Sequence, residues 1–107
     1  MADEAQTEKS NERVVITLRA PVKYEDVEKK ELVLDFGGLS GDDITAIIKA
    51  AERDNGGNPM TVPALDPHVQ KRAAAKAAGV EVGLIGKLGA KDFLDVAGAA
   101  RDFFLDL

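Results

Sequence analysis

Residues 14–36, VVITLRAPVKYEDVEKKELVLDF, contain the two segments that decide the fold class. In each half of this stretch, apolar side chains occupy every second position, which is the period of a β-strand with one buried face. These positions are Val14, Ile16 and Leu18 in the first half, and Leu32, Leu34 and Phe36 in the second. The stretch therefore predicts an N-terminal β-hairpin.

Pro21 interrupts the first apolar segment. A proline cannot donate a hydrogen bond to a sheet, and it restricts the residue before it, so we expect the first strand to end at Ala20. We expect Lys23 to Lys30 to form the connecting turn. Because an isolated hairpin is marginally stable in water, this one must pack on other elements or gain another strand.

The rest of the chain predicts helices. Ser40 is a good N-cap, and Asp43 three residues later resembles a capping box, so a helix should begin there and end at Gly56 or Gly57. Asp66 followed by Pro67 marks the start of a second helix, which Gly79 should end. A short third helix fits residues 80–88, and a last one fits residues from about 90 to the C-terminus. The predicted fold class is α+β, an N-terminal β-hairpin followed by about four α-helices.

Length and composition indicate a single small domain. The chain has 107 residues, of which 45% are hydrophobic, so we expect one folded domain over residues 13–107. Residues 1–12 are polar and lack apolar periodicity, which predicts a disordered leader. The absence of cysteine excludes disulfides and thiolate metal sites. No apolar run reaches membrane-spanning length, so we expect a soluble, cytosolic protein without a membrane partner.

The net charge argues against nucleic acid as a partner. It is −5 overall, and residues 1–66 carry eight basic and 14 acidic side chains. An acidic surface disfavours the phosphate backbone. A helix-turn-helix pattern over residues 67–88 keeps a DNA-binding regulator open as an alternative. Its second helix, however, offers one cation, Lys87, whereas base readout needs forked donors.

Nothing in the sequence predicts a catalytic, cofactor or metal site. Ser40 has no histidine near it in the sequence and is better explained as a helix cap. The single histidine, His68, cannot form a cluster, and Asp42 and Asp43 complement a helix dipole. The segments GLIG and GGLSG lack the lysine and hydroxyl residue of a phosphate-binding loop. We therefore expect a protein that is not an enzyme.

The last helix carries an apolar stripe. Its members recur at spacings of three and four residues, as on one helix face, while Asp92, Asp95, Asp102 and Asp106 lie elsewhere. Burying each phenylalanine stabilises by roughly 1.5–3 kcal/mol, so the core needs part of this face. Two interpretations remain open: the stripe is core alone, or core and interface together. The stripe consists of Phe93, Val96, Ala97, Ala100, Phe103, Phe104 and Leu107.

Two stretches resemble a known family. The first, residues 14–34, has Thr17-Leu18 and Pro21 followed by a second strand containing Glu31-Leu32. The second, residues 74–104, is AAKAAGVEVGLIGKLGAKDFLDVAGAARDFF. In order and spacing, about residues 13–106 resemble the tail assembly chaperones of tailed phages and prophages, of the E/41/14-type family found in Mu-like and related phages.

The resemblance implies a non-enzymatic role without a cofactor. Such chaperones bind the long hydrophobic tape measure protein, keep it soluble and help to recruit tail tube subunits. They act in the host bacterial cytoplasm and are absent from the mature virion. Many exist in a short and a frameshifted longer form, and this chain would be the short one. A structural component of the tail is a further alternative.

We expect the client or a second copy to contact the last helix at Phe93, Val96, Ala100, Phe103 and Phe104. The edge of the first strand, at Val14, Ile16 and Leu18, is the second expected surface. The hairpin has two possible roles: it caps the helical core, or its free edge pairs with a neighbouring copy. We favour self-association through the edge, because a lone hairpin has two unpaired edges.

Overall fold

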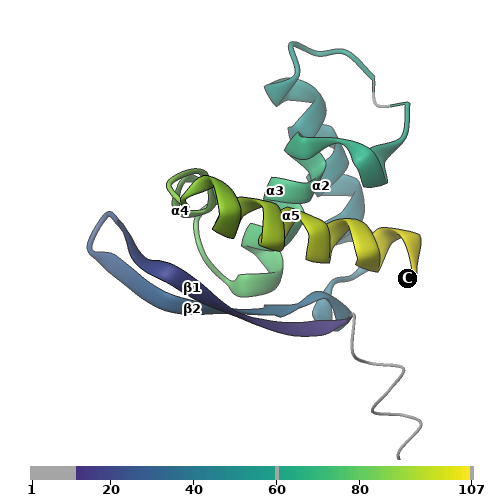
Figure 1. Ribbon diagram of the computed structural model, residues 1–107. Coiled ribbons are helices and arrows are strands. Elements are labelled where there is room, and N and C mark those ends of the chain that lie inside the picture. Colours follow the sequence, from purple (N-terminus) through teal and green to yellow (C-terminus); the bar gives the residue numbers. More distant parts are fainter. Residues whose placement is uncertain (1–11, 60, 107) are drawn as a thin grey trace, which may run out of the picture.

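The chain folds into an N-terminal antiparallel hairpin followed by four α-helices, which confirms the predicted α+β class (Figure 1). This computed structural model describes residues 12–59 and 61–106. Most of the predicted leader, residues 1–12, lies outside the described residues. The elements are β1 Arg13–Tyr24, β2 Val27–Asp35, α2 Gly41–Asp54, α3 Pro67–Ala78, α4 Val82–Gly86 and α5 Ala90–Leu105, with 3-10 turns η1 Phe36–Gly38 and η2 Pro63–Leu65.

Strand β1 does not end before Pro21, so that prediction was wrong. The strand continues to Tyr24 because its pairing with β2 is interrupted where the proline lies. Thr17 pairs with Glu31 and Val22 pairs with Lys29, so residues 18–21 together face only residue 30. A bulge of this kind tolerates proline, since its residues need not donate to the neighbouring strand.

The connecting turn is also shorter than predicted. It consists of Glu25 and Asp26 alone, whereas Lys23 and Lys29, within the range expected to form the turn, pair as parts of the two strands. Both turn residues have positive φ, 49° and 68°. This is the conformation of the two-residue turns that match the twist of antiparallel strands. The hairpin is therefore long, and its tip extends beyond the helices (Figure 1).

One face of the hairpin packs on the helices, as the alternation predicted. Leu32, Leu34 and Phe36 are buried, and so is Leu18 on the first strand. Val22, beyond the bulge, is buried as well. Buried residues thus lie on β1 both before and after Pro21.

The first two α-helices begin at the predicted caps and α3 ends at the predicted glycine, whereas α2 ends at Asp54 with Asn55 as its C-cap, just before the predicted Gly56. The Ser40 hydroxyl accepts a hydrogen bond from the Asp43 backbone N–H (3.0 Å), and the Asp43 carboxylate accepts one from the Ser40 N–H (2.9 Å). Helix α3 begins after Asp66, which accepts from the His68 N–H. It ends at Gly79, whose φ of 69° favours glycine. These local signals are sufficient to delimit α2 and α3.

Helix α5 contributes one side of the core. It packs against α3 on one side and against β1 on the other, and it lies between the hairpin and the other long helices in Figure 1. Val96 and Ala100 are fully buried there. The ring of Phe103 stacks on that of Phe36 with the centroids 5.1 Å apart. The aromatic contact joins the end of the hairpin to the last helix.

Gly83 in α4 makes room for a side chain of the hairpin. A Cβ atom at this position would overlap the ring of Tyr24. Alanine normally stabilises a helix by about 1 kcal/mol relative to glycine. For Gly83→Ala we expect the opposite, a loss of roughly 1–3 kcal/mol through overpacking, measured by urea unfolding.

The control for this prediction is the same substitution in a Tyr24→Ala background. With the ring removed, Gly83→Ala should stabilise the protein. A stabilising effect in both backgrounds would show that Gly83 is not needed for this contact.

Candidate functional site

The structure brings the two predicted partner surfaces together but buries much of both. Val96 and Ala100 of α5 are fully buried, and Leu18 of β1 is nearly so. These three residues cannot contact a partner in this conformation, so their selection as partner-binding residues was wrong. They are needed in the core because the face of α5 that carries them packs on α3 and the hairpin.

The other predicted residues are only partly buried. Phe93, Phe103, Phe104, Val14 and Ile16 pack against the core and keep some exposed surface. Among them, Val14 and Ile16 line an open groove between β1 and α5. The two elements on which the sequence placed the partner surface therefore lie side by side, and the choice of contact residues on them stays a prediction.

The helical wall of this groove is the flank next to the predicted stripe. Leu94 lies there and is 63% exposed, and Leu105, further along the helix, is 44% exposed. Leu94, Gly98, Arg101 and Leu105 are spaced by four, three and four residues, so they share one side of α5. We call this side the α5 flank. The groove is lined by Val14, Val15, Ile16, Thr17, Leu94, Asp95, Gly98, Ala99, Arg101 and Asp102.

The strand wall of the groove is an unpaired edge. The Phe36 N–H donates to the Glu12 carbonyl (2.6 Å), so residues 12 and 36 form a hydrogen-bonded pair. In an antiparallel ladder, hydrogen-bonded pairs occur at every second residue of each strand. The next hydrogen-bonded residues of β1 are therefore Val14 and Ile16. The backbone groups of Arg13, Val15 and Thr17 consequently face away from β2. Within residues 12–59 and 61–106, no other strand pairs with this edge.

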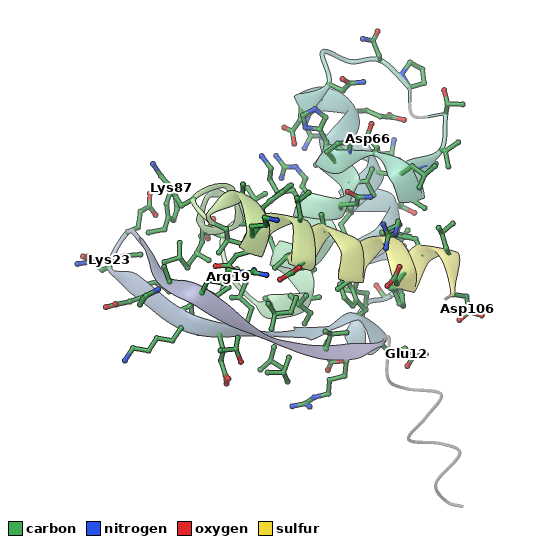
Figure 2. All side chains as sticks on the ribbon, in the orientation of Figure 1. Glu12, Arg19, Lys23, Asp66, Lys87 and Asp106 are labelled. Atoms are coloured by element: carbon green, nitrogen blue, oxygen red, sulfur yellow. The ribbon has the colours of Figure 1, made fainter. Side chains whose placement is uncertain are left out.

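The edge is closed further along, at Arg19. Its N–H donates to both carboxylate oxygens of Asp92 on α5 (3.0 and 3.2 Å), and its guanidinium donates to Asp92 (2.7 Å) and Asp95 (2.9 Å). Arg19 reaches from β1 to α5 in Figure 2. The groove thus runs along Val14 to Thr17 of β1 and stops where α5 binds the bulge.

Asp92 is the only buried charged side chain of the described residues, although it lies off the apolar stripe of α5. Burial alone would raise the pKa of Asp92. The backbone N–H and guanidinium of Arg19 outweigh that effect, and the Ala20 N–H adds to them, so the pKa lies below the usual 3.8. Asp92 is therefore ionised at neutral pH and holds the bulge to the helix. Its long-range partner explains why the sequence did not reveal this role.

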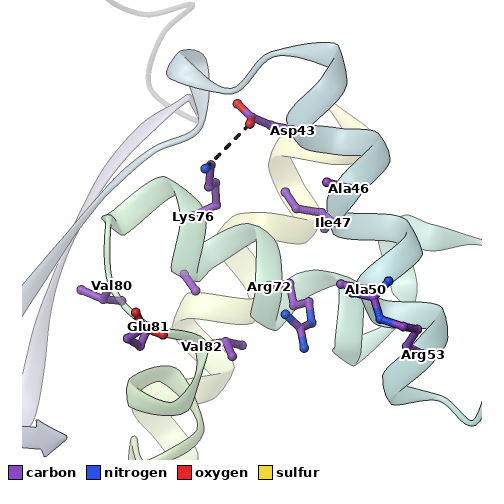
Figure 3. Close-up of a pocket in the computed structure, with 11 residues that line it drawn as sticks. Asp43, Ala46, Ile47, Ala50, Arg53, Arg72, Lys76, Val80, Glu81 and Val82 are labelled. Atoms are coloured by element: carbon purple, nitrogen blue, oxygen red, sulfur yellow. Dashed lines mark ion pairs between the residues drawn. The ribbon is translucent and has the colours of Figure 1, made fainter. Parts of the chain in front are cut away.

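A second groove lies between α2 and the α3–α4 segment and encloses about 370 Å³ (Figure 3). Arg53, Arg72 and Lys76 line it, but two of these cations have carboxylate partners. Arg72 binds Asp54 at 2.7 Å, and Lys76 lies 3.8 Å from Asp43. The hydrogen bonds from Arg72 lower the pKa of Asp54 below its ordinary value. Because two of its three cations are paired with carboxylates, this groove is a poor phosphate site.

The helix-turn-helix pattern over residues 67–88 does not form a DNA-recognition helix. Helix α4 spans only Val82–Gly86, and Leu84 and Ile85 on it are buried. A recognition helix must present several side chains to a groove of DNA. The five residues of α4 therefore offer little surface for base contacts.

Ser40, which the sequence singled out as a cap, takes that role in the structure. Ser40 caps α2 and accepts from Asp43, as described above. In the described part of the chain, no three histidine, cysteine, aspartate or glutamate residues gather to hold a metal ion. None of the helices there is long and apolar enough to cross a membrane.

The β1–α5 groove is the best candidate for a functional site, because it combines exposed apolar side chains with unpaired backbone groups. Both of these features recruit polypeptide chains rather than small polar ligands. No family model matches the chain, and neither a curated protein nor a solved structure matches it.

Proposed function

We propose that this protein is a non-enzymatic assembly chaperone of a phage or prophage tail. It binds the hydrophobic tape measure protein in the host cytoplasm, keeps it soluble and leaves before the virion matures. Recruitment of tail tube subunits and self-association belong to the same proposal. The resemblance of residues 13–106 to such chaperones supports it, and the exposed α5 flank beside the open β1 edge is the observation that carries it.

The physical argument concerns exposed apolar surface. A chaperone of this kind must offer apolar side chains to its client while its own core remains closed. Leu94 and Leu105 meet the first condition, and the buried Val96 and Ala100 on the opposite side of α5 meet the second. Burying one leucine on a client contributes roughly 1.5–3 kcal/mol. One side of the helix can thus bind while the other maintains the fold.

Co-expression with the tape measure protein of the same phage tests the proposal. We expect the client to be soluble and to co-purify only when this protein is present. Leu94→Glu should reduce the co-purified amount about tenfold or more, because it places a charge on the apolar contact. The measurement is the ratio of client to chaperone after affinity purification.

Val62→Glu is the matched control. Val62 is also an exposed apolar residue, 47% accessible, but it precedes η2 and lies outside the groove. It should leave the ratio unchanged. A client that is soluble alone, or that is retained equally by both variants, would contradict the proposal.

A further inference from the structure

We propose that the β1 edge, from Arg13 to Thr17, receives an extended segment of a partner protein as a third strand. The segment would lie in the groove beneath the α5 flank. It would carry apolar residues at alternate positions and an acidic residue beside Arg13. This inference concerns the mode of binding, and it does not require that the partner be a tape measure protein.

The backbone determines the class of occupant. Arg13, Val15 and Thr17 direct their N–H and C=O groups away from β2, as the ladder alternation indicates, and Val15 and Thr17 line the groove. Groups that repeat at every second residue along an edge are matched by another extended polypeptide chain. A helical client could cover Leu94 but would leave these groups unpaired. The geometry therefore favours a strand.

The side chains around the groove determine the pattern of the partner segment. Val14 and Ile16 point to the inner face of the sheet and are half-buried, while Leu94 of the helical wall is exposed. Gly98 has no side chain, and a Cβ there would meet only the guanidinium of Arg101 within 4 Å. Space for side chains thus exists on the inner side of the added strand. Apolar residues at every second position of the segment would fill it.

The charge of β1 argues against pairing with the β1 strand of a second copy of the protein. Strand β1 carries Arg13, Arg19 and Lys23 but no acidic residue. Asp92 and Asp95 bind Arg19, whereas Arg13 has no ion pair within the described residues. Symmetric pairing of two copies through this edge would bring two basic strands together. An acidic residue opposite Arg13 would instead complement it.

Two proline variants test whether the partner segment binds the β1 edge or the β2 edge of the hairpin. The N–H of Val15 faces the groove, so Val15→Pro removes a docking donor without removing a bond to β2. Val33 is paired with Val15, and its N–H faces the opposite edge of the hairpin. Val33→Pro is therefore the matched control. Both variants are first checked for native melting temperature and circular dichroism.

The probe is the peptide VEKKELVLDF, residues 27–36, which has apolar residues at alternate positions 32, 34 and 36 and carries three acidic residues, Glu28, Glu31 and Asp35. Titrated into the ¹⁵N-labelled full chain, it should shift the amide resonances of Arg13, Val15 and Thr17. Val15→Pro should weaken binding about tenfold or more, whereas Val33→Pro should leave it unchanged. A peptide with lysine replacing the three acidic residues should bind more weakly.

Arg13→Glu provides a second variant that keeps the backbone intact. It should weaken binding of the acidic peptide and strengthen binding of the lysine-substituted peptide. The inference is overturned if the three amides do not shift at millimolar peptide, or if both proline variants bind alike. Displacement of native β2, or a dimer that Val15→Pro abolishes, would also overturn it. These results do not depend on whether the tape measure protein binds.

Discussion

Replacing Phe36 with alanine is expected to lower the free energy of unfolding by about 3–5 kcal/mol. Phe36 is fully buried at the end of the hairpin, and its ring stacks on Phe103 of α5. The substitution would leave a cavity at the point where the sheet joins the last helix. In a domain of this size such a loss is a large part of the total stability. Urea unfolding followed by circular dichroism measures it.

Phe104→Ala is the matched control. Phe104 contacts Phe103 edge to face but is only half-buried, so its removal should cost less than that of Phe36. Equal losses for the two variants would contradict the placement of Phe36 at the centre of the core. Both variants lose the same phenylalanine side chain, so the difference between their free energies of unfolding reflects the surroundings of the two rings.

Replacing Asp92 with alanine is expected to lower the melting temperature by roughly 10 °C. The change leaves the Arg19 N–H without its acceptor and removes the ion pair that joins β1 to α5. Asp92 itself is buried although the Arg19 side chain is exposed, so the main loss is that of the buried hydrogen bonds that the carboxylate accepts. Differential scanning calorimetry of the two proteins is the measurement.

Asp95→Ala is the control for this prediction. Asp95 binds the same guanidinium at 2.9 Å, but its side chain is half-exposed. Exposed ion pairs contribute less than about 1 kcal/mol, so this variant should melt within a few degrees of the native protein. A similar effect of both substitutions would refute the special role of Asp92.

The Asp92 contact also predicts how stability depends on pH. Its folded pKa lies below the usual 3.8, so the stabilisation is complete above that value and is lost as the pH falls through the folded pKa. Asp54 and Asp43, whose pKa values are also lowered, contribute in the same direction. Between about pH 5 and pH 2, the native protein should therefore lose more stability than Asp92→Ala does. If the stability of the two proteins fell equally with pH, the lowered pKa of Asp92 would be contradicted.

Much of the secondary structure was predictable from short-range patterns. The caps at Ser40 and Asp66 and the stop at Gly79 depend on hydrogen bonds within a few residues. The alternation at Leu32 and Leu34 correctly identified the buried face of β2. Pro21 misled the prediction, because its effect depends on whether the partner strand needs a donor there, and a bulge removes that need.

The candidate site was predictable only in part. Apolar periodicity located the stripe on α5, but a stripe does not reveal whether a protein's own core or a partner covers it. In the fold, Val96 and Ala100 serve the core, and the neighbouring flank at Leu94 remains exposed. Gly83 is a second feature that only the fold explains. In the sequence this glycine indicates only a weak helix, whereas in the structure it makes room for the ring of Tyr24.

By itself, the sequence determined that an N-terminal hairpin precedes four helices, and it determined where α2 and α3 begin and where α3 ends. The physical reason is that strand period and helix caps depend on neighbours along the chain. Only the tertiary structure decided which side of α5 stays exposed, that Asp92 is buried and that the β1 edge is open from Arg13 to Thr17. These features depend on packing between distant segments, as between Arg19 and Asp92, which are 73 positions apart.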